Sequence, residues 1–511
     1  MERESTPTAG RKKPDYFDDA DVSANMTGNI VRGSAFLAAS SVGGFALNVV
    51  STMILARLLN PEAYGLLAMV FVVTSFLVQF RDMNLTLATV QKAQITHGQI
   101  STIYWFNVTI SCAIAVIVVA LAPGISWFYG EPRLTGIAIF LALPIVIRGF
   151  ASQHKALLRR KMRFGTMVAM DMTSTLAGYC AAVSFAWFGY SYWSLVWLQV
   201  ASSATDLVLC WMVTGWRPSL PRRGSGVGAM LAFGSNLTAY SLIRYVSRSL
   251  DNVIIGRLSG AVVLGVYSRS RDLVGQVSGY AQSPFSAVGV PSLSRLLDQP
   301  ENYRRTFSRL AEKIAILAMP ATALIICTAP EIVEILLGPK WTAAAPVLRI
   351  LCVLISTETM FGAVNWLFIS QGRGGQLLRY GIFDAITRTA AIFIGLSWGM
   401  LGIATALAVT AVSIHLPGQI WYACREGPVR QSDVYRMLAP ILSGSLLGLA
   451  GALLAQRAIP TENPFVTIIL SGSMIAIAVL LVLLFTASGR RLLMDLRRGV
   501  EVLLRRRKTP A

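Results

Sequence analysis

Charge is scarce in this chain: only 14% of its 511 residues are Asp, Glu, Lys or Arg, whereas 54% are hydrophobic. A soluble chain of this length forms domains with charged surfaces, so the composition excludes a soluble enzyme and a disordered chain. The six cysteines show no zinc-type spacing, and we interpret them as small buried hydrophobic residues. A Walker loop is also lacking. We therefore expect no cofactor, no metal site and no ATPase activity of the chain alone.

Long apolar segments fill most of the sequence. Window after window holds about 20 apolar residues, enough for a helix to cross the hydrocarbon core of a bilayer. The runs are continuous rather than alternating, which argues against a transmembrane β-barrel. The fold class we predict is an all-α polytopic membrane protein with about fourteen transmembrane helices. Their expected ranges are 34–58, 64–80, 102–123, 134–152, 166–188, 192–214, 229–256, 262–288, 311–331, 343–370, 377–397, 399–423, 436–456 and 465–487.

The distribution of positive charge predicts the orientation of these spans. A polar tail (1–30) and a basic tail (489–511) flank them. Of the 45 lysines and arginines, 33 lie in the tails and at or beside the loops after even-numbered spans, against 6 in the other loops. By the positive-inside rule both termini face the cytoplasm. The net charge of +20 then indicates contact with anionic lipid rather than with nucleic acid.

An internal repeat relates two halves of the chain. Residues 54–65 read ILARLLNPEAYG and residues 254–265 read IIGRLSGAVVLG, which aligns Arg57 with Arg257 and Gly65 with Gly265. The two segments end spans 1 and 7, so they cross the membrane in the same direction, as in transporters with parallel repeats. We predict an N-terminal lobe (31–215), a cytoplasmic linker (216–228), a C-terminal lobe (229–424) and a final helix pair (436–487).

Polar residues concentrate in spans 7 and 8. Arg244, Arg248 and Asp251 share one helix face, and Asn252 follows them. An arginine at mid-membrane costs about 2.5–3.5 kcal/mol, so it needs a wet cavity or a partner. One interpretation is a cationic cavity between the lobes, with Arg244, Arg248, Asn252, Arg269 and Arg388 as candidate ligands of a diphosphate or an acidic sugar. The alternative is structural pairing of Arg248 with Asp251, Arg269 with Asp272, and Arg388 with Asp384.

Acidic residues within spans are the candidates for ion coupling, because arginine does not release its proton at physiological pH. Asp171 and Glu358 have no cation within one helical turn, and Asp251 lies beside the candidate cavity. These three are the predicted coupling residues. We interpret His415 as a helix-packing histidine and Arg148 as an arginine that extends toward the cytoplasmic interface.

Several stretches together resemble a known family. They are ARLLNPEAYG (56–65), HKALLRRKMRFG (154–165), FGSNLTAYSLIRYVSRSLDNVIIGRLSGAVVLGVYSRSRDL (233–273) and LLGPKWTAAAPVLRIL (336–351). In order and placement they are similar to the Wzx or WzxC-like polysaccharide flippases of the multidrug/oligosaccharidyl-lipid/polysaccharide exporter superfamily. The resemblance covers roughly residues 28–487.

The resemblance implies a transporter rather than an enzyme, with two pseudo-symmetric lobes that alternate access to a central cavity. Its implied substrate is an undecaprenyl-diphosphate-linked oligosaccharide, which is translocated across a bacterial inner membrane for exopolysaccharide, capsule or O-antigen synthesis. We expect a single chain, in contact with membrane lipids, to act as the transport unit. A polymerase and a chain-length regulator are the further partners we expect. The alternatives are a cation-coupled small-molecule exporter, a peptidoglycan-precursor flippase and, from another class, a membrane polysaccharide polymerase. Against drug export, the first lobe shows no obvious acidic cluster.

Overall fold

A computed structural model describes residues 43–81, 95–221, 228–459, 462–486 and 489–490, and the side chains of 228–241, 243–244, 280–281, 283–284 and 287 are outside that description. The described residues form helices joined by short connections, with no strand among them. Ten of these helices are long and apolar enough to cross a membrane, and a shorter apolar helix spans Gly43–Leu58. This confirms the all-α membrane fold, whereas the number of fourteen spans stays a prediction.

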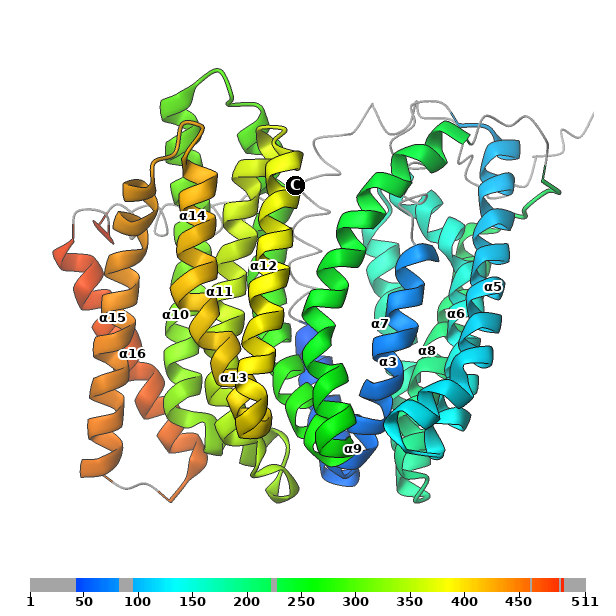
Figure 1. The fold of residues 1–511 in the computed structure, drawn as a ribbon, viewed down its shortest axis with the longest axis horizontal. Coiled ribbons are helices and arrows are strands. Elements are labelled where there is room, and N and C mark those ends of the chain that lie inside the picture. Colours follow the sequence, from blue (N-terminus) through cyan, green and yellow to red (C-terminus); the bar gives the residue numbers. More distant parts are fainter. Residues whose placement is uncertain (1–42, 82–94, 222–227, 460–461, 487–488, 491–511) are drawn as a thin grey trace, which may run out of the picture.

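The first helices along the chain form one group. It contains α3 (Pro61–Arg81), α5 (His97–Tyr129), α6 (Arg133–Arg160), α7 (Phe164–Trp187) and α8 (Ser191–Thr214). Figure 1 shows these helices on one side of the molecule, roughly parallel to one another. The start of the first predicted span, 34–42, and the loop 82–94 lie outside the described residues.

A long segment, α9 (Gly228–Ser294), contains predicted spans 7 and 8. Its helical geometry is interrupted at Gly260, where φ is +80° and ψ is −179°. Residues with a Cβ atom rarely adopt this backbone conformation, whereas glycine adopts it readily. The chain therefore reverses at Gly260 without a longer loop. Figure 1 shows the two halves of α9 meeting at the end where the two groups of helices approach each other.

The second group of helices follows α9. It contains α10 (Pro300–Leu336), the short η1 (Pro339–Trp341), α11 (Ala344–Ser370), α12 (Gly374–Gly395), η2 (Leu396–Trp398), α13 (Gly399–Thr410), η3 (Ala411–His415) and α14 (Leu416–Cys424). The pair α15 (Gln431–Ala458) and α16 (Pro464–Phe485) lies at the outer edge, beside α10 (Figure 1). Gly444 and Gly448 let α15 approach the backbone of α16 at Val479 and Ile475.

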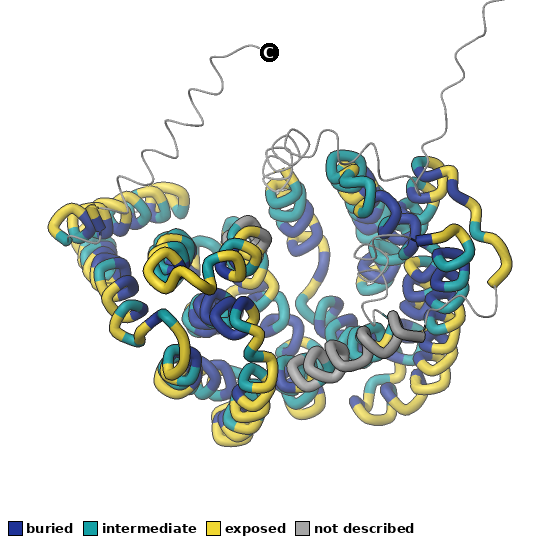
Figure 2. Tube along the Cα trace, turned by 90° about the horizontal axis from the view of Figure 1, so that it is seen from above, coloured by how far each residue is buried: buried dark blue, intermediate teal, exposed yellow. Residues whose placement is uncertain are grey.

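Apolar side chains face both the interior and the outside of the helix groups. Figure 2, which views the helices from above, shows buried residues between helices and exposed ones on the outer surfaces. Many of the exposed residues are large and hydrophobic, among them Val116, Trp187, Ile394 and Leu454. Such surfaces suit a lipid environment, because lipid tails are as apolar as the side chains that face them.

The six cysteines are all free thiols. Cys210, Cys327 and Cys352 are buried, whereas Cys112 and Cys180 are exposed on helix surfaces. The interpretation as buried hydrophobic residues therefore holds for the first three and is wrong for the latter two.

Contacts between the two groups of helices concentrate at one end. The buried indole of Trp341 donates from Nε1 to the carbonyl oxygen of Ala56 at 2.9 Å. Arg57 donates to the carbonyl of Ile335 at 3.2 Å, and Lys340 donates to the carbonyl of Arg57 at 3.4 Å. The bonds to Ala56 and Arg57 satisfy carbonyls in the last turn of helix Gly43–Leu58, which have no partner within that helix. The bond to Ile335 does the same for the last turn of α10.

Candidate functional site

A cavity of about 850 Å³ lies between α3, α9 and α11. Its wall is rich in polar and small residues rather than in large apolar ones. The charged members are Arg248, Arg271, Asp272 and Glu358, and the polar neutral ones include Gln79, Tyr245, Asn252, Gln276, Gln282 and Asn365. A polar volume of this size inside apolar helices can hold a hydrated or charged group away from lipid.

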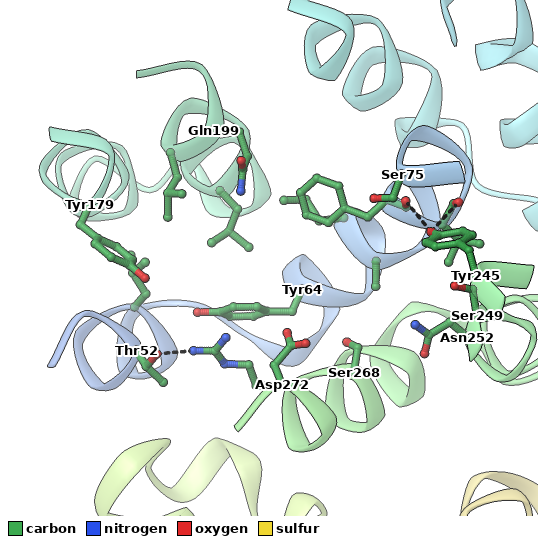
Figure 3. A pocket seen from close by; sticks show the side chains of 18 residues that line it. Thr52, Tyr64, Ser75, Tyr179, Gln199, Tyr245, Ser249, Asn252, Ser268 and Asp272 are labelled. Atoms are coloured by element: carbon green, nitrogen blue, oxygen red, sulfur yellow. Dashed lines mark hydrogen bonds between the residues drawn. The ribbon is translucent and has the colours of Figure 1, made fainter. Parts of the chain in front are cut away.

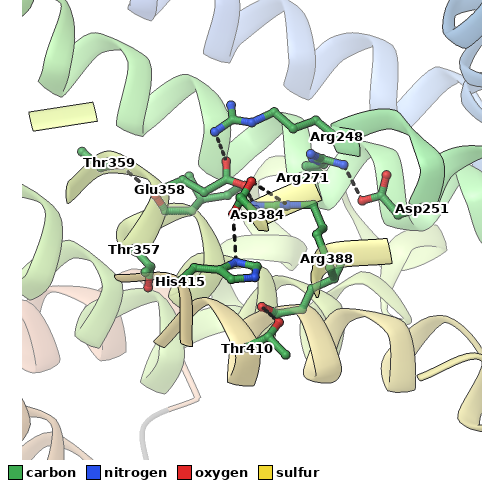
Figure 4. A network of polar contacts seen from close by, with 12 residues as sticks. Arg248, Asp251, Arg271, Thr357, Glu358, Thr359, Asp384, Arg388, Thr410 and His415 are labelled. Atoms are coloured by element: carbon green, nitrogen blue, oxygen red, sulfur yellow. Dashed lines mark hydrogen bonds and ion pairs between the residues drawn. The ribbon is translucent and has the colours of Figure 1, made fainter. Parts of the chain in front are cut away.

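An ion network forms one wall of this cavity (Figure 4). Glu358 of α11 contacts two arginines: Arg248 of α9 at 3.4 Å and Arg388 of α12 at 2.9 Å. Arg388 is buried and also lies 3.8 Å from Asp384, one helical turn away. Asp384 in turn lies 3.1 Å from Nδ1 of the buried His415. The network thus extends from the cavity surface into the interior between α11, α12 and η3.

A second ion pair joins the two halves of α9. Arg271 Nη1 lies 2.5 Å from Oδ2 of Asp251, which is 2% exposed. The same oxygen accepts a hydrogen bond from the Tyr267 hydroxyl at 2.7 Å, and Oδ1 accepts from the backbone of Asn252 at 2.8 Å. A buried carboxylate needs such partners, since an unpaired charge in a low dielectric is costly.

A smaller cavity of about 320 Å³ lies between α3, α7, α8 and α9 (Figure 3). Arg269 donates to the hydroxyl of Thr52 at 2.6 Å, and its guanidinium stacks 5.1 Å from the ring centroid of Tyr64. Tyr245, Ser249 and Asn252 line both this cavity and the larger one. The two cavities are therefore neighbours along the same face of α9.

A third cavity, of about 510 Å³, is lined by α6, α7, α8 and the end of α3. Here Lys155 lies 2.8 Å from Asp171 and 2.9 Å from Asp206. Arg148 lines the same cavity and donates to the side chain of Gln199 at 3.0 Å. Arg148 therefore has a partner within the helix group, and its extension toward the cytoplasmic interface stays a prediction.

The structure separates the candidate residues into those at the central cavity and those elsewhere. Arg248, Asn252 and Glu358 line it, Asp251 is buried beneath it, and Arg388 lies behind Glu358. Arg269 lines the neighbouring cavity and Asp171 the third one. The side chain of Arg244 lies outside the described residues. Roles in substrate binding or ion coupling stay predictions for all of them.

Of the local pairs that the sequence offered as alternatives, Arg388 with Asp384 is present, at 3.8 Å. Arg248 pairs with Glu358 rather than with Asp251, whose partner is Arg271. Asp171 and Glu358, which have no cation nearby in the sequence, obtain theirs from other helices. Sequence spacing finds partners within one helical turn, and it gave no signal for these pairs across helices. The contact between Asp384 and His415 also joins two different helical segments and could not be predicted from spacing.

Together, the apolar helices, their two groups and the polar cavity define a multi-pass membrane protein with the fold of multidrug/oligosaccharidyl-lipid/polysaccharide superfamily transporters. The lipid II flippase MurJ in an inward closed conformation superposes with a TM-score of 0.67 at 10% identity, over 88% of this chain and 98% of that one. A multidrug resistance MATE family transporter in an inward-facing conformation gives 0.56 at 15% identity, over 74% and 93%.

The sequence comparisons identify the family. The model of the polysaccharide biosynthesis protein family matches residues 54–346, so the chain belongs to this family. The lipopolysaccharide biosynthesis protein WzxC of Escherichia coli is 25% identical over 71% of this chain and 75% of its own length. The succinoglycan biosynthesis transport protein ExoT of Rhizobium meliloti is 22% identical over 92% and 96%. The resemblance found in the sequence is confirmed.

Proposed function

We propose that this protein is a flippase that moves undecaprenyl-diphosphate-linked oligosaccharide units across the bacterial inner membrane for the synthesis of a surface polysaccharide. The observation that carries the proposal is the polar cavity of about 850 Å³ with Arg248 and Arg271 in its wall. Arginine recognises phosphate through two parallel hydrogen bonds and stays charged. The names of the two relatives refer to lipopolysaccharide biosynthesis and to transport in succinoglycan biosynthesis, and both fit a substrate of this kind.

The balance of charge in the cavity determines how an anion would bind. Two arginines and two carboxylates line the wall, and Arg248 already contacts Glu358 at 3.4 Å. The Arg248 side chain is 34% exposed, so it remains accessible from the cavity. A diphosphate carries more negative charge than one carboxylate and therefore competes with Glu358 for this guanidinium. Asn252 and Gln276 supply neutral donors beside it.

The proposed mechanism is alternating access. The contacts of Trp341, Lys340 and Arg57 close one end of the interface between the helix groups. In the topology that the positive-inside rule predicts, this end faces the periplasm and the opposite end faces the cytoplasm. Binding from the cytoplasm would then precede rupture of these contacts and release on the outer side. The prenyl tail stays in lipid while the headgroup occupies the cavity. Within this proposal one chain forms the transport unit, with a polymerase and a chain-length regulator acting next to it.

A peptidoglycan-precursor flippase is the second candidate, favoured by the fold shared with MurJ. The substrates of both candidate flippases carry a polyprenyl diphosphate, so the arginines of the cavity suit either substrate. They differ in the sugars attached to the diphosphate, which makes the identity of the accumulated lipid the deciding observation.

The test is to delete the gene and to analyse lipid-linked glycans by mass spectrometry, together with their leaflet. We expect complete polysaccharide repeat units on the cytoplasmic face. Accumulated lipid II would favour the second candidate, and repeat units that reach the outer face without being polymerised would indicate a polymerase and overturn the flippase proposal.

A matched pair of variants tests the cavity in the same assay. The double variant Arg244→Ala/Arg248→Ala is expected to abolish polymer export at normal membrane levels, whereas Arg379→Ala, exposed on α12, should export normally. Normal export by the double variant would overturn the role of these arginines.

A further inference from the structure

We propose that His415 and Asp384 form a proton-binding site that Arg388 and Glu358 link to the anion-binding Arg248. The linkage rests on the proposed function, because it requires an anion at Arg248. The proton site itself does not, since it follows from the local geometry of the histidine.

Thr387 contacts one of the two ring nitrogens of His415. Its Oγ1 lies 2.9 Å from the carbonyl oxygen of Phe383 and 3.2 Å from that of Asp384, within reach as a donor to its own helix. The same hydroxyl lies 2.8 Å from Nε2 of His415. When Nε2 carries a hydrogen it donates to this hydroxyl, whose own hydrogen goes to the backbone, and Nδ1 of the neutral ring then has a free lone pair.

Nδ1 lies beside a carboxylate. It is 3.1 Å from Oδ1 of Asp384, and in this tautomer both atoms are acceptors. Within the described part of the chain, neither atom has a hydrogen-bond donor, and both are buried. Two acceptors at this distance repel each other unless a hydrogen lies between them. One proton on Nδ1 converts the contact into a charge-assisted hydrogen bond.

The backbone holds the ring in this place. His415 ends η3, a five-residue π-helical segment inside the helix that runs from Gly399 to Cys424. The Tyr380 hydroxyl donates to the carbonyl oxygen of His415 at 2.5 Å and anchors this segment to α12. Single π turns often occur at functional sites, because they redirect one side chain out of the helical pattern.

The charged groups that face His415 come from two neighbouring helices: Asp384 and Arg388 of α12, and Glu358 of α11. A small cavity of about 40 Å³ reaches Asp384 and also borders Arg248, Phe361 and Asn365 of the central cavity wall. This volume suffices for about one water molecule. A proton from water in the central cavity thus has a polar route to Asp384 and the imidazole nitrogen.

The ion network couples this proton to the anion (Figure 4). Arg248, Arg271 and Arg388 balance Asp251, Glu358 and Asp384 when His415 is neutral. An anion at Arg248 draws this arginine from Glu358, which then relies on Arg388, 2.9 Å away. Arg388 gives up its longer contact with Asp384, whose remaining partner is His415. Proton uptake on Nδ1 restores the balance, and by reciprocity the proton strengthens anion binding.

The first experiment counts protons. Farnesyl diphosphate is titrated into the purified full chain in detergent at pH 7, by calorimetry in two buffers of different ionisation enthalpy. The dependence of the heat on the buffer gives the protons exchanged per diphosphate. We expect the variants His415→Gln and Asp384→Asn each to take up fewer protons per bound diphosphate than the unaltered protein, by at most one proton. The matched control is His154→Gln, which removes another buried histidine, hydrogen-bonded to Thr214. Equal proton counts for the unaltered protein and both site variants would overturn the linkage.

The second experiment needs no anion. In a His97→Gln/His154→Gln background, His415 is the one histidine left in the chain. Nitrogen-15 NMR then reports both ring nitrogens. We expect the second ring proton to bind at a higher pH when Asp384 is present than in the added Asp384→Asn variant, because the carboxylate stabilises the charged ring. A ring that behaves alike with and without Asp384 would overturn the proton site and leave the proposed function intact. Failure of farnesyl diphosphate to bind the unaltered protein would instead count against the proposed function and the linkage, with the proton site judged by NMR alone.

Discussion

Gly265, which the internal repeat aligns with Gly65, packs against the segment that contains Gly65. A Cβ atom added to Gly265 would lie 1.9 Å from the carbonyl oxygen of Pro61 and 3.0 Å from the backbone nitrogen of Gly65. A Cβ atom on Gly65 would lie 1.7 Å from the carbonyl oxygen of Ala261. The aligned segments therefore meet backbone to backbone at the contact between α3 and α9.

Alanine at either glycine should disrupt this contact. The clashing atoms belong to the backbone, so a change of rotamer does not relieve the overlap, and we expect Gly65→Ala and Gly265→Ala each to cost about 1–3 kcal/mol or to abolish folded yield. Thermal unfolding of the purified protein in detergent measures the effect. Gly275→Ala on the same helix is the control, because a Cβ there meets no atom within 4 Å. Equal melting temperatures for all three variants would contradict the packing described.

The ion network makes a second prediction, which concerns stability. Arg388→Gln leaves the buried carboxylate of Glu358 with Arg248 alone, and breaking such a buried pair costs about 3–5 kcal/mol. The double variant Glu358→Gln/Arg388→Gln should recover part of this loss, because neither charge is then left unpaired. Denaturation of the single and double variants gives the coupling energy. Arg379→Gln should remain within about 0.5 kcal/mol of the unaltered protein, and strictly additive losses at 358 and 388 would argue against the pair.

The helices could be predicted from the sequence, because continuous apolar runs report burial in lipid directly. The boundary between predicted spans 7 and 8 falls on Gly260, where the chain reverses. The start of α10 at Pro300 precedes the predicted span because residues 300–310 are polar and extend the helix beyond its apolar part.

The partners within the site could not be predicted in the same way. Arg248 and Glu358 are 110 positions apart, and their contact depends on how α9 packs against α11. Asp384 and Arg388 were recognised as neighbours because they share one helical turn, whereas His415 joins them through the packing of η3 on α12. Periodicity indicates which face of a helix is polar, but it does not identify the opposite helix.

A third prediction concerns topology. In a cysteine-free background, Pro132→Cys should react with an impermeant maleimide from the outer side, and Gln299→Cys only after the inner side is made accessible. Pro132 is preferred to its neighbour Gly130, whose φ of +70° disfavours a side chain. Both positions are exposed, so burial does not limit the reaction. If Gln299→Cys reacts from the outer side and Pro132→Cys only from the inner side, the chain has the opposite orientation to the one predicted.

A fourth prediction concerns acid stability at the connection between α5 and α6. Hydrogen bonds from Arg133 to Glu131, at 2.7 and 2.9 Å, hold the pKa of this carboxyl group below its usual value. Because the folded-state pKa lies below the unfolded one, the stabilisation is complete above the unfolded value of about 4.3 and is lost as the pH falls through the folded one.

The variant Arg133→Gln should therefore destabilise the protein at neutral pH and matter less near pH 3. Melting temperatures from pH 3 to pH 7 provide the comparison, with Arg457→Gln, on the last turn of α15, as the control. A difference between Arg133→Gln and the unaltered protein that does not change with pH would contradict the assignment to Glu131.

The last prediction tests the closed end of the interface. Trp341→Phe removes the indole donor from the carbonyl of Ala56, which lies in the last turn of its helix, and leaves that buried acceptor unpaired at a cost of about 1–2 kcal/mol. If this contact closes the outer end, its loss shifts the population toward outward access by about 5- to 30-fold. The measurement is the rate at which an impermeant maleimide, added from outside, reacts with Gly275→Cys in the wall of the central cavity. Trp398→Phe, at an indole that is 71% exposed, should leave the rate unchanged. A rate in Trp341→Phe that matches this control would show that other contacts keep the end closed.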